Sequence, residues 1–424
     1  MLIYLLYNGL LTCLAPIWLP WMLWRASRRK PMPDWNQRSG RYALPRHDQR
    51  IWFHAVSVGE VIAAKPILQE IRRLAPDANL VVSVTTSSGF ATAETQLKDI
   101  VDHVIYFPID FARFQLSAMQ QLRPKVAVLM ETELWFNFLW AASVFDIPVI
   151  LVNGRISERS GKRMRALRPV FGQMIAWLSR AMMQSQGDAD RIRALGNTRV
   201  EVVGNSKFDE ADAPGGLRAE DWPAQLGNRP DRPVVVFGSI RAEEFDLTLG
   251  VAAQLLPIAD VVFAPRHLDR RDELTIALRR AFPNATPGYR SQGDRLRPDA
   301  PLILDTYGEL GSLYQIATVA VIGGGFAKLG GQNLIQPLAH GVPVVHGPHM
   351  FNFRSATELA LAEGASFVAT DPATLLHEVS QLLTNPERHA AAARAARKIV
   401  AENRGASRRY AEAIVEPIIG TMNR

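Results

Sequence analysis

The stretch IWFHAVSVGEV, residues 51–61, decides the fold. Residues 51–53 are apolar and suit a buried β-strand, residues 57–59 suit a tight turn, and residues 61–74 have apolar positions at helical spacing. Glu60 therefore falls where a strand ends and a helix begins. Ligands of open α/β folds bind beyond the carboxyl ends of strands, so Glu60 is a candidate catalytic base. The alternative is a first-turn glutamate that the helix dipole favours.

The whole chain alternates strand-like and helix-like segments, a pattern typical of parallel sheets. Strands are predicted at residues 51–55, 80–85, 103–107, 126–130, 149–152, 181–184 and 200–203, and then at 234–237, 261–264, 302–305, 319–322, 342–345 and 366–368. Turn-rich sequence at 212–216 and 227–233 marks a domain boundary. We predict an α/β protein with two Rossmann-like, doubly wound domains facing a cleft, at residues 51–213 and 214–424. The last helix, from residue 386 onward, is a candidate to pack back on the first domain.

Composition limits the compartment and the partners. The 424 residues suffice for two domains with their own cores, and 48% of them are hydrophobic. Cys13 is the only cysteine, which excludes an intramolecular disulfide and fits a reducing compartment. The net charge of +7 favours an anionic partner such as a phospholipid surface, a phosphorylated substrate or a nucleic acid. Nucleic acid is the weakest of these, because no aromatic-interleaved basic motif appears.

The amino-terminal segment predicts membrane attachment. Residues 1–24 carry no charge and are long enough to span a bilayer, and three tryptophans lie near the end of the segment (Trp18, Trp21, Trp24). A basic linker, residues 25–50, follows, so we expect a single membrane anchor with the rest of the chain in the cytosol. A cleaved signal peptide fits less well, since no cleavage site is visible. Pro16 and Pro20 also permit a segment that lies in the membrane without crossing it.

Glycine and polar residues follow several predicted strands of the second domain. Gly323, Gly324 and Gly325 come directly after one strand, and a second glycine pair at 330–331 precedes Asn333 and a short helix. Backbone N–H groups in this stretch predict a phosphate cradle. Packing is the alternative reason for such a loop. The end of another strand carries Pro265, Arg266 and His267, and Gly238 and Ser239 follow a third. No metal-binding pattern stands out, so we expect no metal.

The first domain has a comparable pair of acids. Glu131 and Glu133 follow the strand at 126–130, and Lys207 follows the last strand of the domain. A solvated helix start explains at least one of the acids, and an ordinary surface position is the commoner role of a lysine. The functional alternative places one acid and the lysine in the active site.

Six segments together carry a family resemblance. They are HAVSVGE at 54–60, ETELW at 131–135, NGRIS at 153–157, GNSKFD at 204–209, PRH at 265–267 and GPHMFNF at 347–353. In order and spacing they resemble the transferases of 3-deoxy-D-manno-octulosonic acid (Kdo). The resemblance covers nearly the whole chain and implies a GT-B glycosyltransferase of two domains. Such enzymes transfer Kdo from CMP-Kdo to a lipid A precursor (lipid IVA) in lipopolysaccharide biosynthesis, without a metal or other cofactor.

The resemblance also implies residue roles. Glu60 resembles the general base that activates the acceptor hydroxyl in an inverting reaction, and Glu131 and Lys207 resemble a pair that stabilises the transition state. The matching CMP-binding positions are Pro265, Arg266, Gly308, Glu309, Leu310, Asn333, Leu334, Ile335 and Gln336. The basic region near the amino terminus would keep the enzyme on an anionic lipid surface. Neither oligomeric state nor the number of Kdo residues transferred follows from the sequence.

The chain departs from the family pattern in two places. The usual segment reads approximately GGHNPLEP, whereas residues 330–337 read GGQNLIQP, so that Gln332 and Gln336 replace a histidine and a glutamate. Phe136 stands where proline is usual. Two alternatives follow: a related GT-B enzyme with another nucleotide-sugar donor or a non-lipid-A acceptor, and a membrane-bound binding protein that lost turnover. Against the second, Glu60, Lys207 and Arg266 are all present.

We predict that Gln336→Glu strengthens CMP binding. A carboxylate accepts hydrogen bonds from both ribose hydroxyls with charge assistance, whereas a glutamine amide offers one neutral acceptor. The expected gain is about 1–2 kcal/mol, roughly five- to thirtyfold in Kd, measurable by titration calorimetry. An unchanged Kd would show that this position does not weaken nucleotide binding.

Overall fold

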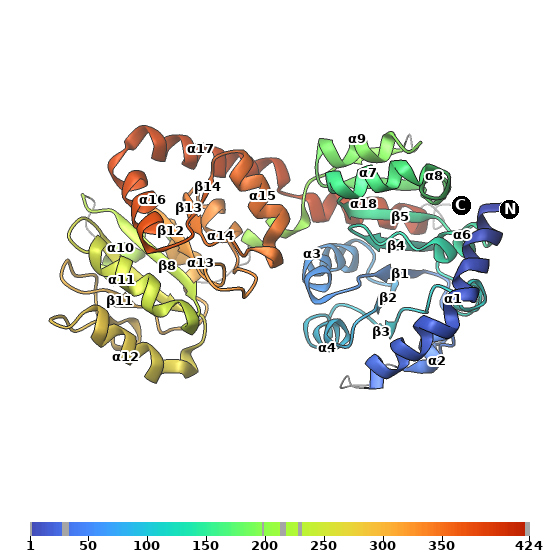
Figure 1. Cartoon of the computed structure of the whole chain (residues 1–424), viewed down its shortest axis with the longest axis horizontal. Helices are drawn as coiled ribbons and strands as arrows, with labels where there is room; N and C mark the ends of the chain where they lie inside the picture. The colour runs from blue at the N-terminus through green and yellow to red at the C-terminus, as the bar shows by residue number, and fades with distance from the viewer. Residues whose placement is uncertain (1, 28–33, 197–198, 213–217, 228–230, 420–424) are drawn as a thin grey trace. The chain divides into compact units, whose positions relative to one another are not determined.

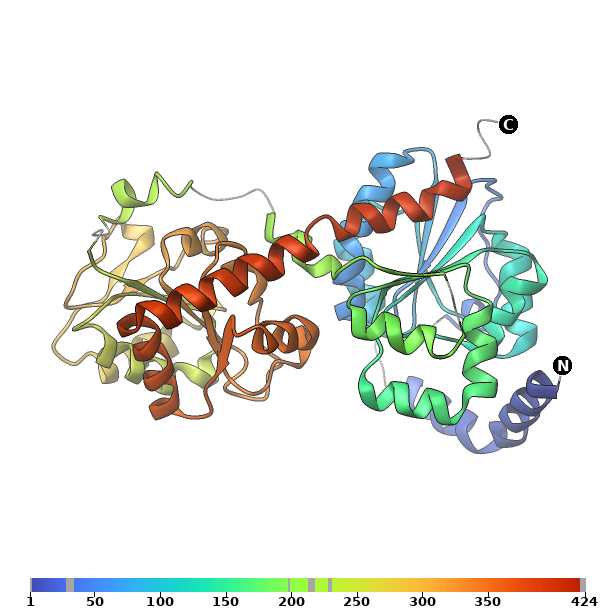
Figure 2. The same ribbon diagram turned by 90° about the horizontal axis from the view of Figure 1, so that it is seen from above.

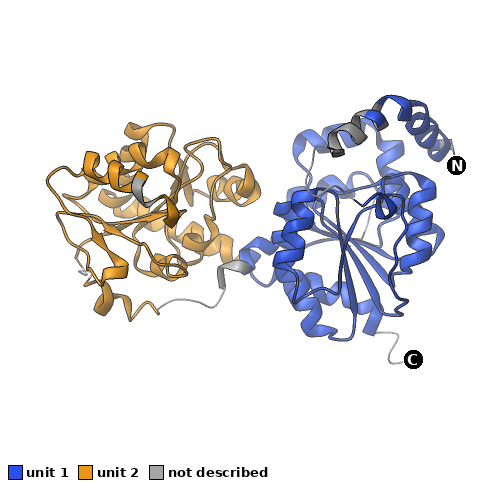
Figure 3. Ribbon diagram, turned by 90° about the horizontal axis from the view of Figure 1, so that it is seen from below, with its two compact units in different colours: residues 1–209, 403–424 blue, residues 210–402 orange. Residues whose placement is uncertain are grey.

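The computed structural model describes residues 2–27, 34–196, 199–212, 218–227 and 231–419. The chain forms two compact units, shown in Figure 3. Unit 1 contains Met1–Asp209 and Asn403–Arg424, and unit 2 contains Glu210–Glu402. The chain thus passes between units at 209/210 and again at 402/403, while the sequence placed one boundary at 213/214. Residues 34–50 of the predicted linker belong to unit 1, and residues 28–33 lie outside the described part of the chain.

Unit 1 is built on a seven-stranded parallel sheet in the order β3-β2-β1-β4-β5-β6-β7 (Figure 1). The strands are β1 (Arg50–His54), β2 (Asn79–Val84), β3 (His103–Tyr106), β4 (Val126–Met130), β5 (Val149–Gly154), β6 (Arg180–Met183) and β7 (Val200–Val202). Every residue of β1, β2, β4 and β5 is buried. Strands buried on both faces need continuous apolar runs, which is why the sequence revealed them.

Helices cover both faces of this sheet. Those of unit 1 are α1 (Leu2–Ser27), α2 (Trp35–Arg38), α3 (Val58–Leu74), α4 (Ser87–Gln96), α5 (Ala112–Leu122), α6 (Phe136–Val144), α7 (Glu158–Ala166), α8 (Arg168–Ala176), α9 (Gln186–Arg193), α18 (Ala406–Ile419) and the 3-10 helix η1 (Ser206–Asp212). One core joins the sheet to α3, α4 and α18, and the other joins it to α5, α6, α8 and α9. Figure 2 shows α18 across the strands of unit 1, where the Tyr410 hydroxyl donates to the Gly204 carbonyl at 2.6 Å.

Unit 2 repeats the plan with a parallel sheet in the order β10-β11-β9-β8-β12-β13-β14. Its strands are β8 (Val234–Ile240), β9 (Asp260–Pro265), β10 (Gly288–Tyr289), β11 (Leu302–Ile303), β12 (Val319–Ile322), β13 (Val344–His346) and β14 (Ser366–Val368). Its helices are α10 (Trp222–Leu226), α11 (Phe245–Leu255), α12 (Arg271–Ala281), α13 (Leu310–Leu313), α14 (Ile335–Ala339), α15 (Arg354–Ala362), α16 (Pro372–Thr384) and α17 (Pro386–Asn403), the last of which ends at the passage to unit 1. The prediction of two parallel-sheet α/β domains is therefore confirmed.

The amino-terminal helix α1 packs on unit 1 through its first turns. The ring of Tyr4 lies 4.4 Å from that of Trp140, and the ring of Tyr7 lies 4.6 Å from that of Phe136. Among the residues described, no helix combines the length and the hydropathy that crossing a bilayer requires.

Candidate active site

Glu60 lies in the first turn of α3, directly beyond the carboxyl end of β1 (Figure 1). Its side chain turns back toward the strand: the Val56 N–H donates to Oε2 at 2.9 Å, and the Ser57 hydroxyl donates to Oε1 at 3.1 Å. The carboxyl group therefore occupies the start of the helix, as the dipole alternative expected. It also belongs to a cluster of charged groups from other elements, which that alternative does not explain.

The environment of Glu60 suits a general base. Burial and, after it, repulsion from the nearby Glu131 carboxylate together raise the pKa of Glu60 from 4.5 to about 8. The hydrogen bonds from Val56 and Ser57 act in the opposite direction but do not cancel the increase. A base is most effective when its pKa lies near the working pH, and burial plus a neighbouring acid supply this shift.

Glu131 pairs with Lys207, and the Glu131 carboxylate lies close enough to Glu60 to raise the pKa of Glu60. The Lys207 Nζ is 4.0 Å from Glu131 Oε1, and both side chains are largely buried. Glu131 follows β4 and has φ of +51°, a left-handed conformation that is costly for a residue with a side chain. The structure therefore unites, within unit 1, the three residues to which the resemblance gave catalytic roles.

Two asparagines hold the turn that carries Lys207. The Asn153 carboxamide oxygen, at the end of β5, accepts from the Ser206 N–H at 3.2 Å, and that of Asn205 accepts from the Lys207 N–H at 3.0 Å. The Ser206 hydroxyl donates to the Ala63 carbonyl of α3 at 2.9 Å, so the lysine turn is fixed to the helix of Glu60. Asn153, like Glu131, has φ of +51°. Its place in NGRIS was visible in the sequence, but its partner lies 53 residues away.

Glu133 is a further acid of this site that received no separate role from the sequence. Burial raises the pKa of Glu133, and repulsion from Glu131 adds to the increase. Glu133 in turn raises the pKa of Glu60. The site thus contains three carboxyl groups that act on one another electrostatically, one of which, Glu131, pairs with Lys207.

The predicted CMP positions all lie in unit 2, beyond the ends of neighbouring strands. Pro265 ends β9, and the N–H of the exposed Arg266 donates to the Ile240 carbonyl at 2.8 Å. Gly308 has φ of +82° and precedes α13, after β11. The structure brings the segments at 308–310 and 333–336 together, because a Cβ at Gly311 would lie 3.4 Å from Nε2 of Gln336.

The individual side chains at these positions differ in what they offer a ligand. Glu309 is already paired with Arg290 at 3.0 Å and accepts from the Thr306 hydroxyl. Leu334 and Ile335 are buried, so they offer only backbone groups. The Asn333 carboxamide oxygen accepts from the Ile335 N–H at 2.8 Å. Arg266 and Gln336 are therefore the freer side chains of this set.

The phosphate cradle predicted at Gly323, Gly324 and Gly325 is wrong. The Gly324 N–H donates to Oε2 of Glu244 at 2.7 Å, and the N–H groups of Phe326 and Ala327 donate to Oε1 at 2.8 and 3.1 Å. Glu244 is buried, with 1% of its surface exposed. The loop does bind an anion, but the anion is a carboxylate of the same chain. Sequence could not show this, because Glu244 lies 80 residues before the loop.

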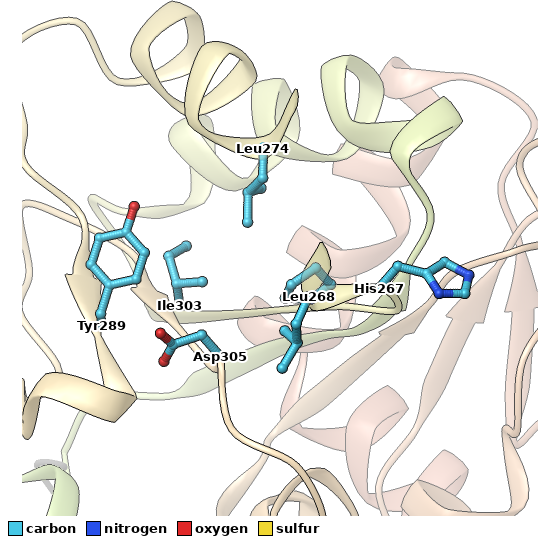
Figure 4. A pocket seen from close by; sticks show the side chains of 7 residues that line it. His267, Leu268, Leu274, Tyr289, Ile303 and Asp305 are labelled. Carbon is cyan, nitrogen blue, oxygen red and sulfur yellow. The ribbon is translucent and has the colours of Figure 1, made fainter. Parts of the chain in front are cut away.

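A small cavity lies near Pro265 and His267. Figure 4 shows the side chains of Leu274, Tyr289 and Ile303 facing one space, with Asp305 beside them, while the His267 ring points away from Tyr289. Its volume is about 100 Å³. Sites for small organic ligands usually measure about 300–1,000 Å³, so this cavity does not hold a nucleotide as it stands.

Comparison with known proteins identifies the family of this chain. Residues 33–210 match a family model described as 3-deoxy-D-manno-octulosonic-acid transferase (kdotransferase). The 3-deoxy-D-manno-octulosonic acid transferase of Bordetella pertussis is 34% identical over 429 residues, which cover 96% of this chain and 98% of the relative. The chain belongs to the Kdo transferase family. The family member from Haemophilus influenzae is 29% identical and covers 85% of each chain.

Solved structures support the fold of this Kdo transferase. MurG of Acinetobacter baumannii superposes with a TM-score of 0.57 at 12% identity, covering 86% of this chain and 99% of MurG. The UDP-GlcNAc 2-epimerase of Neisseria meningitidis gives 0.53 at 13% identity, covering 88% and 100%. At such low identity these likenesses show the fold alone, which is the GT-B fold. The resemblance drawn from the sequence is confirmed, and the protein is a glycosyltransferase.

We predict that Glu60→Gln stabilises the protein increasingly as pH rises. Because the pKa of Glu60 is raised from 4.5 to about 8, its contribution to stability is full below the lower value and is lost as pH rises through the higher one. Glutamine has no proton to lose. The free energy of unfolding of the variant should therefore gain about 1–3 kcal/mol relative to wild type between about pH 5 and about pH 9.

Denaturant unfolding at several pH values measures this difference. Glu70→Gln is the matched control, because Glu70 lies on the same helix and its carboxylate pairs at the surface with Arg73 at 2.7 Å. A difference between Glu60→Gln and wild type that stays constant with pH would refute the raised pKa.

Proposed function

We propose that this Kdo transferase moves Kdo from CMP-Kdo to the lipid A precursor lipid IVA during synthesis of the lipopolysaccharide core. The observation that carries the proposal is the buried Glu60 carboxyl, whose pKa is raised to about 8 in part by Glu131, the partner of Lys207. A buried base next to a lysine suits transfer of an anionic sugar to a hydroxyl group. The family membership supports the same reaction.

In the proposed mechanism Glu60 accepts the proton of an acceptor hydroxyl. That oxygen attacks the anomeric carbon of Kdo and forms the new C–O bond, while the bond from this carbon to the CMP phosphate oxygen breaks. Attack from the face opposite the leaving group inverts the configuration. The proton remains on Glu60, the bonding electrons leave with CMP, and the base is restored when the proton passes to solvent.

In this step Lys207 stabilises negative charge, and Glu131 orients the lysine. The Kdo carboxylate and the departing phosphate are both anionic, and a lysine in a largely buried position stabilises them more than it would in water. Glu131 orients the lysine at 4.0 Å and keeps the pKa of Glu60 high. Removal of either partner therefore affects both the base and the leaving group.

For the donor we propose the edge of unit 2 formed by the ends of β9, β11 and β12. Arg266 supplies a positive charge for the phosphate, and backbone N–H groups at Gly308, Glu309 and Leu310 supply further donors. Asn333, Leu334, Ile335 and Gln336 complete the set on the other side of Gly311. This donor set allows transfer without a metal.

A second candidate is a related glycosyltransferase with another nucleotide sugar or another acceptor. Gln332 and Gln336 favour it, because they remove a histidine and a carboxylate from the segment that resembles the donor site. A panel of CMP and UDP sugars separates the two. A binding protein without turnover fits less well, because burial of the Glu60 carboxyl costs stability and binding alone would not require it.

We also propose that α1 attaches the enzyme to the cytoplasmic face of the inner membrane. One side of the helix packs on unit 1 through Tyr4 and Tyr7. Apolar residues on the rest of its surface are exposed: Leu5 59%, Leu6 64%, Leu10 62%, Leu14 44% and Ile17 72%. A row of exposed leucines on one helix fits insertion into the interface of a bilayer. This arrangement corresponds to the alternative in which the segment lies in the membrane.

We predict that wild-type protein transfers Kdo to lipid IVA in detergent and that Glu60→Gln loses this activity by about 10²–10⁴-fold. CMP-Kdo is prepared separately, because its synthesis requires magnesium, and EDTA is added before the transfer step. Product formed by the wild type with EDTA supports metal-independent transfer. Absence of product, alongside an active control transferase, would favour the second candidate.

We predict that replacing Leu5, Leu6 and Leu10 together by serine lowers binding to phosphatidylethanolamine and phosphatidylglycerol vesicles by about tenfold or more. The matched control replaces three exposed residues of unit 2, Ile258, Ile276 and Leu361, by serine. Flotation with vesicles measures the bound fraction. Equal binding of the two triple variants would contradict attachment through α1.

A further inference from the structure

Asp110 is a buried acid outside the set of residues described above. It lies in the loop after β3, with 7% of its surface exposed. Three donors from two other parts of unit 1 surround its carboxylate: the Tyr7 hydroxyl at 3.0 Å, the Asn137 N–H at 3.2 Å and the Phe138 N–H at 3.1 Å. Burial raises the pKa of Asp110 to about 7, and the three hydrogen bonds favour the carboxylate and oppose that increase.

This carboxylate supplies the missing cap of α6. The first N–H groups of a helix have no partner within the helix, and a side chain usually accepts from them. Trp135 stands at the cap position of α6, and its side chain makes no such bond. Asp110 takes that place from a loop 25 residues earlier in the chain. The start of α6 is thus fixed by a residue of another element.

The start of α6 in turn determines where Glu131 lies. Only residues 131–135 connect β4 to α6. At the strand end of this connection the Glu131 N–H donates to the Val152 carbonyl at 3.0 Å. Five residues held at both ends leave little freedom, so a shift of α6 displaces Glu131 and Glu133. Both acids raise the pKa of Glu60.

Helix α1 contacts this same point. Its Tyr7 hydroxyl reaches Asp110, and the Tyr7 ring stacks on Phe136, the first residue of α6. The next residue of each helix forms a reciprocal amide pair, since the Asn8 and Asn137 carboxamides donate to each other at 2.9 and 3.0 Å. Three polar contacts and a ring stack therefore link α1 to Asp110 and the first turn of α6. Packing alone would require only the apolar contacts.

We propose that Asp110 is a positioning residue for the loop of Glu131 and that Tyr7 couples the docking of α1 to this loop. The inference rests on the proposed function, since it concerns the rate of the same transfer step. In physical terms, the docked α1 helix holds the Asp110 carboxylate in the position where it accepts hydrogen bonds from the first backbone N–H groups of α6. When Tyr7 no longer donates, the cap loosens and the Glu131 loop samples other positions.

The test compares Tyr7→Phe with Tyr4→Phe in full-length protein. Tyr7→Phe removes one hydroxyl and retains the ring on Phe136, so the fold is preserved. Tyr4→Phe is the control, because it makes the same change one turn earlier in α1, where the ring packs on Trp140. We expect Tyr7→Phe to lower kcat by about three- to tenfold, the effect of one hydrogen bond, with KM for CMP-Kdo unchanged and Tm lowered by only a few degrees. Tyr4→Phe should match the wild type. A kcat equal to that of the wild type, or an equal loss in both variants, would overturn the proposal.

Hydrogen exchange separates this inference from the reaction itself. Peptides that cover residues 131–138 should exchange faster in Tyr7→Phe than in Tyr4→Phe or wild type. The exchange of the same peptides should be faster still in Asp110→Asn. This readout needs no substrate. If the wild type transferred no Kdo, the proposed function would fail while the coupling could still be observed. Unchanged exchange at residues 131–138 in both Tyr7→Phe and Asp110→Asn would refute the coupling.

Discussion

The burial of the Glu60 carboxyl beside Glu131 is the constraint on which the catalytic half of the molecule depends. A carboxyl removed from water and placed near a like charge binds its proton more tightly, which costs stability at neutral and alkaline pH. The fold accepts this cost because α3 is fixed on both sides. Its inner face packs in the core with α18, and Ala63 accepts the Ser206 hydroxyl. The arrangement that raises the pKa of Glu60 is therefore a property of the whole unit.

Backbone strain occurs at the same edge of the sheets. Among the described residues, the non-glycine positions with positive φ include Glu131 just after β4, Asn153 near the end of β5 and Ser239 in the bulge of β8. Such conformations persist where the surrounding structure determines them, and they concentrate at functional sites. In unit 1 they direct a carboxylate and a carboxamide toward the turn of Lys207. Backbone strain and buried charge thus occur together at one preorganised site.

The sequence predicted the sheets well because their strands are buried on both faces. The expected ranges 126–130 and 319–322 coincide with β4 and β12, parallel strands in which every residue is buried. β10, a strand of only two residues that begins with Gly288, carries no such pattern and was missed. Glu60, Glu131 and Lys207 were identified through local motifs that stand at strand ends.

Hydrogen bonds between residues far apart in the chain could not be predicted from the sequence. The glycine loop after β12 looked like a phosphate cradle, since nothing local shows that Glu244 already fills it. Asp110 is a single acid in an apolar segment, and its partner Tyr7 lies 103 residues away. In both cases a carboxylate caps backbone amides of a distant element. The two acids differ in their consequence for function. Glu244 occupies the backbone N–H groups of an expected ligand site, and Asp110 supports the loop of the candidate active-site residue Glu131.

The pH dependence of kcat/KM for Kdo transfer, in wild type and in Glu131→Gln, tests the role of Glu60 most directly. We expect the wild-type rate to rise with pH to a plateau, with a midpoint at about 8, because the base must be deprotonated. Removing the Glu131 charge should lower the midpoint, whatever it does to the plateau. A rate that is independent of pH between about 6 and about 9, or a midpoint that stays in place in Glu131→Gln, would contradict a buried Glu60 base.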